Sequence, residues 1–545
     1  MIISLTQFAG VAPRNAPHLL RPEQAQVAIN CAPWGSLKPL SDTIQVQSGL
    51  SGTTSSTIYK FGGTFGRDDL YWFHWPDKAV DVVKGAISGD VSERTYFIKD
   101  GVAYKTNNSL ALTGGSGDYP WNSKRLGVPA PNSALTVTLD ASAIGDPDTA
   151  QDRSYTYTFV TSWGEESQPA VPSNSVLSGV GHIVLMSGFD ATPGDEFDVV
   201  AVRLYCTNTG TSGNANFQFL AERPVGLSSF YHVIDDAALG ETCPSMEWAQ
   251  VPELDGMIGM ANGMIIGYKG GDVIPLEAYR PFAAPEGYRL ATDFKIVGGA
   301  SFGNSAVLCT EGNPYLLNGN EPSSLALQKM EIPQACLSKR SISEVAGGVV
   351  YASPDGLIHI SPNGSPTNLT EELFGKKDWL SLSPNSMHGY GIEDKYVGFY
   401  DTGSVRGGFV LDLRAKTFIF LDFYATAGFT DLIQDALYLK VGTNLVKFDH
   451  GVQEYTFTWK SKVFRLPKAE NFSWAQCYAA SYSSPITMKM YVDGVLKFTK
   501  SVTNQKPFRL PAGFKGLNYE IELTGNKEIL SVHLATSTAE LQSVI

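Results

Sequence analysis

Five segments of this chain begin at nearly equal intervals, and each contains an apolar strand, a turn centred on Gly or Asp, and a second apolar strand. They start at Met257, Ala300, Val345, His388 and Thr430, so the intervals are 43, 45, 43 and 42 residues. Propeller blades are four-stranded sheets, and they repeat about every 40 to 45 residues in the sequence. One such sheet cannot bury both faces alone, so several must pack around an axis. The spacing therefore predicts a β-propeller-like core in an all-β protein.

The segments outside the repeats predict further β-structure. Residues 70–75 and 95–104 are apolar strands like those of the repeats, and we expect them to complete the same ring. The Pro-rich stretch 126–131 predicts a stiff link, and residues 154–161 beyond it alternate aromatic and Thr residues as a half-buried strand does. After Gln453 the blade interval stops, although strand patterns continue. The fold class is therefore all-β, with a β-propeller-like core, an inserted small β-sandwich and a C-terminal β-sandwich.

These features divide the chain into five parts. The first is rich in proline and predicts an ordered arm with one short helix-compatible piece, 23–29. The parts are an N-terminal arm (1–54), N-terminal propeller strands (55–118), an inserted antiparallel β-sandwich (119–252), β-propeller blades (253–453) and a C-terminal β-sandwich (454–545).

Asp-Gly pairs between apolar segments predict tight hairpins. They occur at Asp100-Gly101, Asp355-Gly356 and Asp493-Gly494. A type I′ turn needs positive φ at both central residues, and Asp-Gly suits this requirement. The pair at 355–356 resembles the Asp box of sialidase propellers, but no Thr-Trp follows it, so we interpret it as a turn.

The net charge of the chain argues against a protein that binds nucleic acid tightly. The net charge is −13 and no basic run occurs, whereas binding of the phosphate backbone requires clustered Lys and Arg. An acidic wall would instead let a polyanion pass without sticking. A chain of 545 residues also exceeds what one hydrophobic core usually organises, which agrees with several units.

The cysteines and the N-terminus indicate a protein made in the cytoplasm. The six cysteines include no CxxC pair, so we expect reduced thiols and no zinc site. The start, MIISLTQFAGVAP, lacks the basic region of a secretory signal, and no apolar run approaches the roughly 20 residues of a membrane span. We expect no stable insertion into a membrane.

Catalytic motifs are weak throughout. Adjacent carboxylates are poor candidates for acid–base chemistry because neighbours in a strand point to opposite faces. The eight histidines include no HExxH motif, and no nucleotide-binding or GxSxG pattern is present. The carboxylate pairs considered are Asp68-Asp69, Glu165-Glu166, Asp235-Asp236 and Glu371-Glu372. We therefore predict no catalytic, cofactor or metal site and no enzyme activity.

Several short motifs resemble one known family. They are residues 30–40 (NCAPWGSLKPL), 119–121 (YPW), 126–131 (LGVPAP), 159–167 (FVTSWGEES), 472–476 (FSWAQ), 508–513 (FRLPAG) and 530–537 (LSVHLATS). In this order, and with β repeats between them, they resemble the tail nozzle proteins, or tail tubular protein B family, of short-tailed bacteriophages. The resemblance spans most of the chain.

The resemblance implies a structural protein of the virion tail. Members of that family form a sixfold ring below the portal and adaptor, which continues the DNA channel, retains and releases the genome, and offers attachment surface for fibres. The partners implied are five further copies, an adaptor protein, tail fibres or a needle, and double-stranded DNA that passes through without sequence-specific binding. We expect Gly- and Asn-rich loops to narrow the bore, with Asn318, Gly319, Asn320 and Glu321 as the candidate gate.

Two other classes of protein remain open. One is a propeller enzyme that hydrolyses host glycans with loop carboxylates. The other is a glycan-binding module without catalysis, in which an exposed aromatic side chain such as Trp72 or Trp379 stacks on sugar rings.

Overall fold

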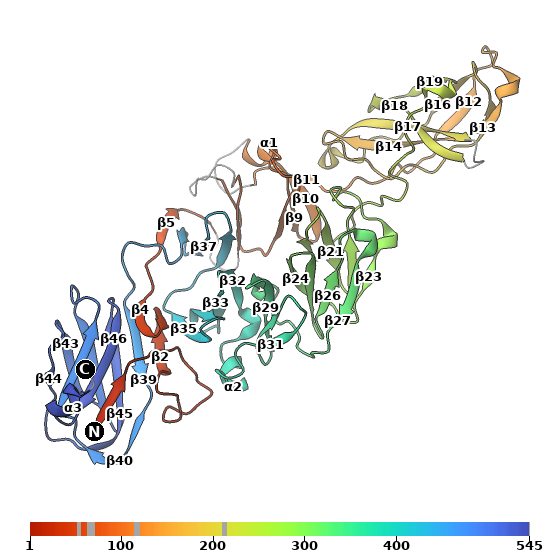
Figure 1. The fold of residues 1–545 in the computed structure, drawn as a ribbon. Coiled ribbons are helices and arrows are strands. Elements are labelled where there is room, and N and C mark those ends of the chain that lie inside the picture. Colours follow the sequence, from red (N-terminus) through yellow and green to blue (C-terminus); the bar gives the residue numbers. More distant parts are fainter. Residues whose placement is uncertain (52–55, 63–70, 114–119, 210–214, 544–545) are drawn as a thin grey trace.

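The chain folds almost entirely into antiparallel β-sheets. The computed structural model describes residues 1–51, 56–62, 71–113, 120–209 and 215–543. Its α-helices within these ranges are single short turns: α1 (Asn108–Leu112), α2 (Lys376–Leu380) and α3 (Thr538–Gln542). The prediction of an all-β protein is therefore confirmed. Figure 1 shows an elongated molecule with three parts in a row.

Six small sheets and a four-stranded part of a larger sheet make up the middle of the molecule within the described residues, and we call these seven the ring sheets. In chain order they are β6 (Thr57–Lys60) with β7 (Trp72–Trp75); β8 (Asp81–Lys84), β9 (Thr95–Lys99), β10 (Val102–Thr106) and β11 (Lys124–Arg125); β20 (Gly256–Gly259), β21 (Ile265–Lys269), β22 (Asp272–Pro275) and β23 (Leu290–Ala291); β24 (Ile296–Phe302), β25 (Ser305–Thr310), β26 (Tyr315–Asn318) and β27 (Ala326–Lys329); β28 (Ser343–Val345), β29 (Gly348–Ser353), β30 (Gly356–Ile360) and β31 (Pro366–Asn368); β32 (His388–Ile392), β33 (Lys395–Asp401), β34 (Arg406–Asp412) and β35 (Thr417–Leu421); and β36 (Ala427–Asp431), β37 (Ala436–Val441) and β38 (Asn444–Lys447) with β5 (Ile44–Gln47).

The ring sheets contact one another in a closed cycle. Their first strands meet in the order β6, β36, β32, β28, β24, β20 and β8. The cycle closes where Trp75 of β7 packs on Phe97 of β9, with ring centroids 5.1 Å apart. The five repeat starts predicted from the sequence lie in β20, β24, β28, β32 and β36, the first strand of five of these sheets.

Close packing of the first strands explains why residue 391 of β32 is a glycine. A Cβ atom on Gly391 of β32 would lie 1.9 Å from the carbonyl oxygen of Glu344 in β28. The Gly391 N–H donates to the hydroxyl oxygen of Ser343 at 2.8 Å, and the Gly391 carbonyl accepts from the hydroxyl of Thr430 in β36. Three successive ring sheets are thus joined at this one residue.

Residues 1–54, predicted as an arm, form strands that pair with strands far later in the chain. Their strands are β1 (Ile2–Leu5), β2 (Ala25–Ile29), β3 (Cys31–Trp34), β4 (Ser36–Pro39) and β5. β1 pairs with β46, β2 with β35 and β39, and β5 with β38 of the last ring sheet. The helix-compatible interpretation of 23–29 is wrong, because pairing with β39 holds Ala25–Ile29 as a strand.

The chain termini share one unit, which we call the terminal unit: β1, β3, β4 and the strands that follow the ring sheets. The latter are β39 (Phe457–Ser461), β40 (Phe464–Glu470), β41 (Trp474–Ala479), β42 (Ile486–Val492), β43 (Val495–Val502), β44 (Phe508–Arg509), β45 (Gly516–Gly525) and β46 (Ile529–Ala535). β2 links β35 of a ring sheet to β39, so a single ten-stranded sheet runs from β32 into this unit. Its buried side chains belong to the same hydrophobic core as those of β33 to β35.

A third unit is inserted between β11 and β20, and we call it the inserted unit. One sheet contains β12 (Thr136–Leu139), β16 (Ile183–Ser187) and β19 (Ser229–Val233), a second contains β14 (Tyr155–Thr161), β17 (Val199–Thr209) and β18 (Ala215–Pro224), and β13 (Gln151–Arg153) pairs with β15 (Val176–Ser178). The core between the two larger sheets includes Tyr157, Met186 and Leu204.

β14 differs from the half-buried strand that its alternating pattern predicts. All seven of its residues are buried. The Thr face is covered by the chain that follows, since Thr156 donates to the carbonyl oxygen of Ala170 at 2.7 Å and Thr158 donates to Glu166 at 2.8 Å. Hydroxyls that are hydrogen-bonded in this way can be buried at little cost.

Two of the three predicted Asp-Gly turns are confirmed. Asp100-Gly101 has φ of 53° and 81°, and Asp493-Gly494 has φ of 48° and 79°, as a type I′ turn requires. The third hairpin is present, because the strands on either side of 354–355 pair, but its predicted turn residues are wrong: Ser353 pairs with Gly356, so Pro354 and Asp355 form the turn. The proline ring fixes φ of residue 354 near −65°, which excludes a primed turn.

Candidate functional site

The predicted gate segment, residues 318–321, lies in the connection from β26 to β27. Asn318 accepts from Ser305 at 2.5 Å, and Asn320 accepts from Asn304 at 3.0 Å and from Asn262 at 3.3 Å. This connection is therefore tied to the β20–β21 and β24–β25 turns of two ring sheets. It joins the last two strands of its sheet, away from the first strands that make the cycle. A role of Asn318, Gly319, Asn320 and Glu321 as a channel gate stays a prediction.

The carboxylate pairs of the described residues make local structural contacts or are exposed. Asp68-Asp69 lies outside the described residues. Asp236 binds Arg153 at 2.9 Å, and Asp235 caps a short helical turn through the N–H of Ala237. Glu371 and Glu372 are exposed. In the described ranges no three His, Cys, Asp or Glu side chains are placed to hold a metal ion.

Other sequence predictions have mixed outcomes. All six cysteines are buried free thiols, as the reduced-thiol interpretation predicts. Trp72 and Trp379, named as sugar platforms, are only 2% and 0% exposed, so that assignment is wrong. Both pack in apolar cores, where their large surface stabilises the sheets. Among the helices of the described residues, none has the length and apolar character needed to span a bilayer.

Glu165 and Glu166 instead have structural contacts. Glu165 links the inserted unit to the ring sheets, and Glu166 links strands within the inserted unit. Glu165 forms an ion pair with Lys105 of β10, which is fully buried. Trp163 lies against the same lysine and against Arg94, whose cationic groups are 5.0 and 5.6 Å from its ring. Burial raises the pKa of Glu165, and the charge of Lys105 opposes this rise. This contact is a buried, charged joint between the inserted unit and the sheet of β8 to β11.

Glu166 has a different role, although it is the next residue. Its carboxylate accepts from Thr158 of β14, from Tyr205 of β17 at 2.5 Å and from Arg203 at 2.9 Å. All these partners belong to the inserted unit. With its lone pairs occupied, the Glu166 carboxylate is a structural centre and not a free acid or base.

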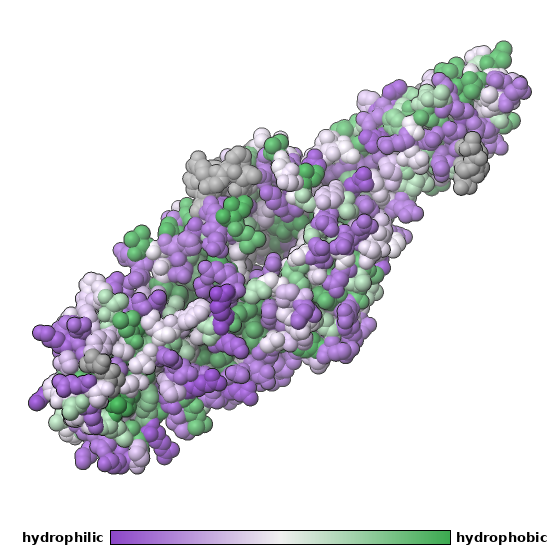
Figure 2. Space-filling model, in the orientation of Figure 1, coloured by the Kyte–Doolittle hydropathy of each residue, from purple (hydrophilic) through white to green (hydrophobic). Residues whose placement is uncertain are grey.

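The outer face of the β12–β16–β19 sheet carries a group of apolar side chains, partly or largely exposed, beside the polar residues Thr136 and Thr138 of β12. Leu185 lies opposite Tyr231, and Ile183 lies opposite Val233, so these four side chains share one face. Their neighbours Val184, Met186 and His232 point into the core. Tyr231 and Val233 are 58% and 59% exposed. Figure 2 shows apolar surface on the far end of this unit, distant from both termini.

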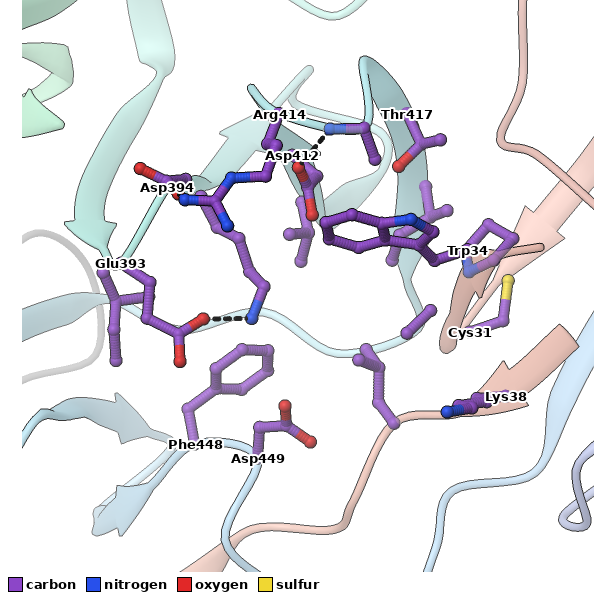
Figure 3. Close-up of a pocket in the computed structure, with 18 of the residues that line it drawn as sticks. Cys31, Trp34, Lys38, Glu393, Asp394, Asp412, Arg414, Thr417, Phe448 and Asp449 are labelled. Atoms are coloured by element: carbon purple, nitrogen blue, oxygen red, sulfur yellow. Dashed lines mark hydrogen bonds and ion pairs between the residues drawn. The ribbon is translucent and has the colours of Figure 1, made fainter. Parts of the chain in front are cut away.

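A cavity of about 460 Å³ lies where the β3–β4 hairpin meets the ring sheets (Figure 3). Its lining comes from β3 and β4, from the turns β32–β33, β34–β35 and β36–β37, and from the residues after β38. Cys31, Leu40, Val410, Ile419 and Phe448 supply its apolar surface. The indole of Trp34, 60% exposed, projects into the same space as Asp412.

Charged side chains surround this apolar surface. Lys395 binds Glu393 at 2.5 Å, and Arg414 binds Asp394. Asp449 accepts a hydrogen bond from the N–H of Ser41 at 2.7 Å, and burial raises the pKa of its carboxyl group. This site could not be predicted from the sequence, because its residues come from three distant segments. The only sequence signal was Trp34 in a hairpin flanked by prolines.

Comparisons with known proteins assign neither a family nor a function. No family model matches the chain, and no curated protein matches it. The structure of BBS1N in complex with ARL6DN is similar over 75% of this chain and 96% of that chain, with 8% identity and a TM-score of 0.28. AztD of Citrobacter koseri is similar over 68% and 98%, with 9% identity and a TM-score of 0.25. An exo-β-1,3-galactanase from Phanerochaete chrysosporium is similar over 90% and 100%, with 8% identity and a TM-score of 0.18.

Proposed function

We propose that this chain is the tail nozzle protein of a short-tailed bacteriophage, a structural virion component without enzyme activity. In this proposal the ring sheets form a seven-bladed β-propeller, and the inserted and terminal units are β-sandwiches. Several copies, six by the family resemblance, form a ring that continues the DNA channel below an adaptor and offers attachment surface to fibres or a needle. The acidic composition, with a net charge of −13, suits a passage for DNA.

The exposed apolar face of the inserted unit is the observation that carries this proposal. Side chains such as Tyr231 and Val233 would be poorly placed on a monomer, because exposed apolar patches of this kind mark protein contacts. The face lies at one end of an elongated molecule, so a neighbouring copy can reach it without blocking the ring sheets. A head-to-tail contact of this kind closes into a ring when its rotation fits.

Electron microscopy of the purified chain, alone and with candidate adaptor rings, tests the proposal. We expect closed rings for the natural chain. Replacing Tyr231 and Val233 by Lys places two charges in the contact, and we expect the fraction of assembled rings to fall at least about tenfold.

A matched control is Val200→Lys in β17, because Val200 is 47% exposed but belongs to the other large sheet of the inserted unit. This variant should assemble as the natural chain does. Particles that stay monomeric with every adaptor would contradict the proposal. Hydrolysis or saturable binding of host glycan by the monomer would favour the alternative, a propeller-type glycan-hydrolysing or glycan-binding tail protein.

A further inference from the structure

We propose that the cavity beside Trp34 binds an arginine side chain presented by an extended segment of a partner protein. The inference concerns the surface of one subunit and does not depend on ring assembly. It follows from the balance of charge in the cavity, from its apolar surface and from the exposed indole at its mouth.

The charge balance leaves an excess of carboxylates. Each cation of the lining already has an acidic partner: Lys395 has Glu393, Arg414 has Asp394, and Lys38 lies 3.7 Å from Glu528 outside the cavity. Asp412, Asp435 and Asp449 also line the cavity. Within the described residues, no Lys, Arg or His nitrogen lies within 4.0 Å of the carboxylate oxygens of these three, although Lys395 and His450, which also line the cavity, lie near enough to act on Asp449 electrostatically. A cationic ligand would supply that missing partner, whereas phosphate or another anion would be repelled.

Asp412 and Asp449 are held in place by the backbone. Asp412 accepts from the N–H of Ala415, and Asp449 accepts from the N–H of Ser41, both at 2.7 Å. A carboxylate accepts several hydrogen bonds, so each retains free acceptor sites toward the cavity. Both groups are therefore fixed before a ligand arrives, which reduces the ordering cost of binding.

The apolar surface and the indole favour arginine over lysine. A guanidinium group is planar and weakly hydrated, so it can stack on an aromatic face while its edge donates to carboxylates. Trp34 offers such a face beside Asp412 (Figure 3). The aliphatic part of the arginine side chain would then cover apolar residues such as Val410 and Phe448.

The size of the cavity agrees with a side chain and its flanking backbone. Its volume of about 460 Å³ lies within the range of about 300 to 1,000 Å³ that is typical of ligand pockets. One arginine side chain leaves room for part of the neighbouring residues. This space favours an arginine within a peptide segment over a small free cation.

Isothermal titration with two synthetic peptides tests the inference. The probes are acetyl-Ala-Leu-Arg-Leu-Ala-amide and the same peptide with citrulline, which is neutral and nearly isosteric with arginine. We expect saturable binding of the arginine peptide to the full chain and an affinity at least about tenfold lower for the citrulline peptide. Free arginine amide should bind more weakly than the arginine peptide, because it lacks the flanking residues.

Variants locate the binding. Asp449→Asn and Asp412→Asn keep an oxygen that accepts from the backbone but remove the charge, and each should lower the affinity about fivefold to twentyfold. Trp34→Ala alters an exposed side chain and should lower it about fivefold. The matched controls are Asp378→Asn and Trp121→Ala, which are exposed and outside the cavity, and they should leave the affinity unchanged.

The inference is overturned if arginine and citrulline peptides bind equally, if neither binds at up to about 5 mM, or if the Asp449, Asp412 and Trp34 variants all bind as the natural chain does. Saturable binding of a neutral oligosaccharide that the arginine peptide fails to displace would also overturn it. Rings seen by microscopy without peptide binding would disprove this inference and leave the nozzle proposal intact, and the reverse result would do the opposite.

Discussion

The terminal unit and the inserted unit both pack sheets on sheets, yet they join the ring sheets in different ways. The terminal unit shares a ten-stranded sheet and a hydrophobic core with β32 to β35. The inserted unit has its own core, and its joint to the sheet of β8 to β11 includes the Lys105–Glu165 ion pair and Trp163. Lys124 of β11 also donates to the carbonyl oxygen of Asp195, and Arg125 lies over the ring of Phe197. One junction is continuous backbone pairing, and the other consists of side chains.

This difference teaches which part of the molecule can move. Sheet continuity cannot be broken locally without exposing backbone groups and apolar surface. A joint made of side chains can open while both partners stay folded, because each has its own core. We therefore expect the terminal unit to be rigid against the ring sheets and the inserted unit to be the adjustable part.

The largest expected effect is at the shared sheet. Trp459 in β39 is fully buried, packs edge-on against Phe8 with ring centroids 5.0 Å apart, and donates to the carbonyl oxygen of Ala9 at 3.0 Å. Trp459→Ala should lower the free energy of unfolding of the terminal unit by about 3 to 5 kcal/mol. Hydrogen exchange of peptides from β39 and β45 across a urea series measures this loss.

The control for this change is Trp34→Ala, since Trp34 is exposed and its removal should cost at most about 0.5 kcal/mol. A loss below about 1 kcal/mol for Trp459→Ala would mean that the N-terminal strands contribute little to the terminal unit. The proposed rigidity of that junction would then be wrong.

The shared sheet also marks the limit of what the sequence can predict. The repeat interval located five first strands because most strands of each of these sheets follow one another in the sequence. The pairing of β1 with β46 and of β5 with β38 joins residues hundreds of positions apart, and no local pattern encodes such pairing. Pro13, Pro17 and Pro22 suggested an arm, while the strands before and after them, β1 to β5, have only four or five residues each.

The second effect concerns the joint of the inserted unit. Lys105→Met leaves Glu165 buried without its cation. Opening of the joint returns Glu165 to water, so we expect the variant to favour the open joint by about 2 kcal/mol relative to the natural chain. Spin labels on exposed residues Leu177 and Leu496 should show a broader distance distribution. Adding Glu165→Gln to the same chain should restore part of the narrow distribution.

Lys269→Met is the matched control, because Lys269 pairs with Glu253 on the surface, where both side chains are about half exposed or more. It should leave the distance distribution unchanged. If Lys105→Met also leaves it unchanged, the joint is held by other contacts and the inserted unit is as rigid as the terminal unit.

The same pair shows why the candidate sites were only partly predictable. Glu165-Glu166 was visible in the sequence as adjacent carboxylates, and the structural interpretation of such pairs was favoured. Which carboxylate serves the joint and which serves the core depends on Lys105 and Arg203, whose distances from the pair in sequence carry no signal. The cavity beside Trp34 is harder still, because its carboxylates come from four separate turns.

The smallest expected effect is a loss of stability of the inserted unit as the pH falls. His232 in β19 contacts Tyr155 at 3.1 Å inside the inserted unit, and burial lowers its pKa to about 4. The unfolded chain, with a histidine pKa near 6.5, binds more protons than the folded one between these values. The stability that the neutral histidine contributes is therefore complete above about pH 6.5 and is lost as the pH falls, by about 1 kcal/mol at pH 5.5. Hydrogen exchange of β14 and β19, corrected for intrinsic rates, should show this loss between pH 8 and pH 5.5.

His232→Leu removes the titrating group, so the variant should be less stable than the natural chain at pH 8, where the contact with Tyr155 is lost, and should lose less stability on acidification. The exposed His18 provides the control, and His18→Leu should retain the full pH dependence of the inserted unit. Equal slopes for the natural chain and His232→Leu would show that another group controls the acid response. If the slope does flatten, acidification destabilises the core of the inserted unit independently of the Lys105–Glu165 joint. The Lys105→Met and His232→Leu variants together then distinguish movement of the whole inserted unit from local unfolding of its sheets.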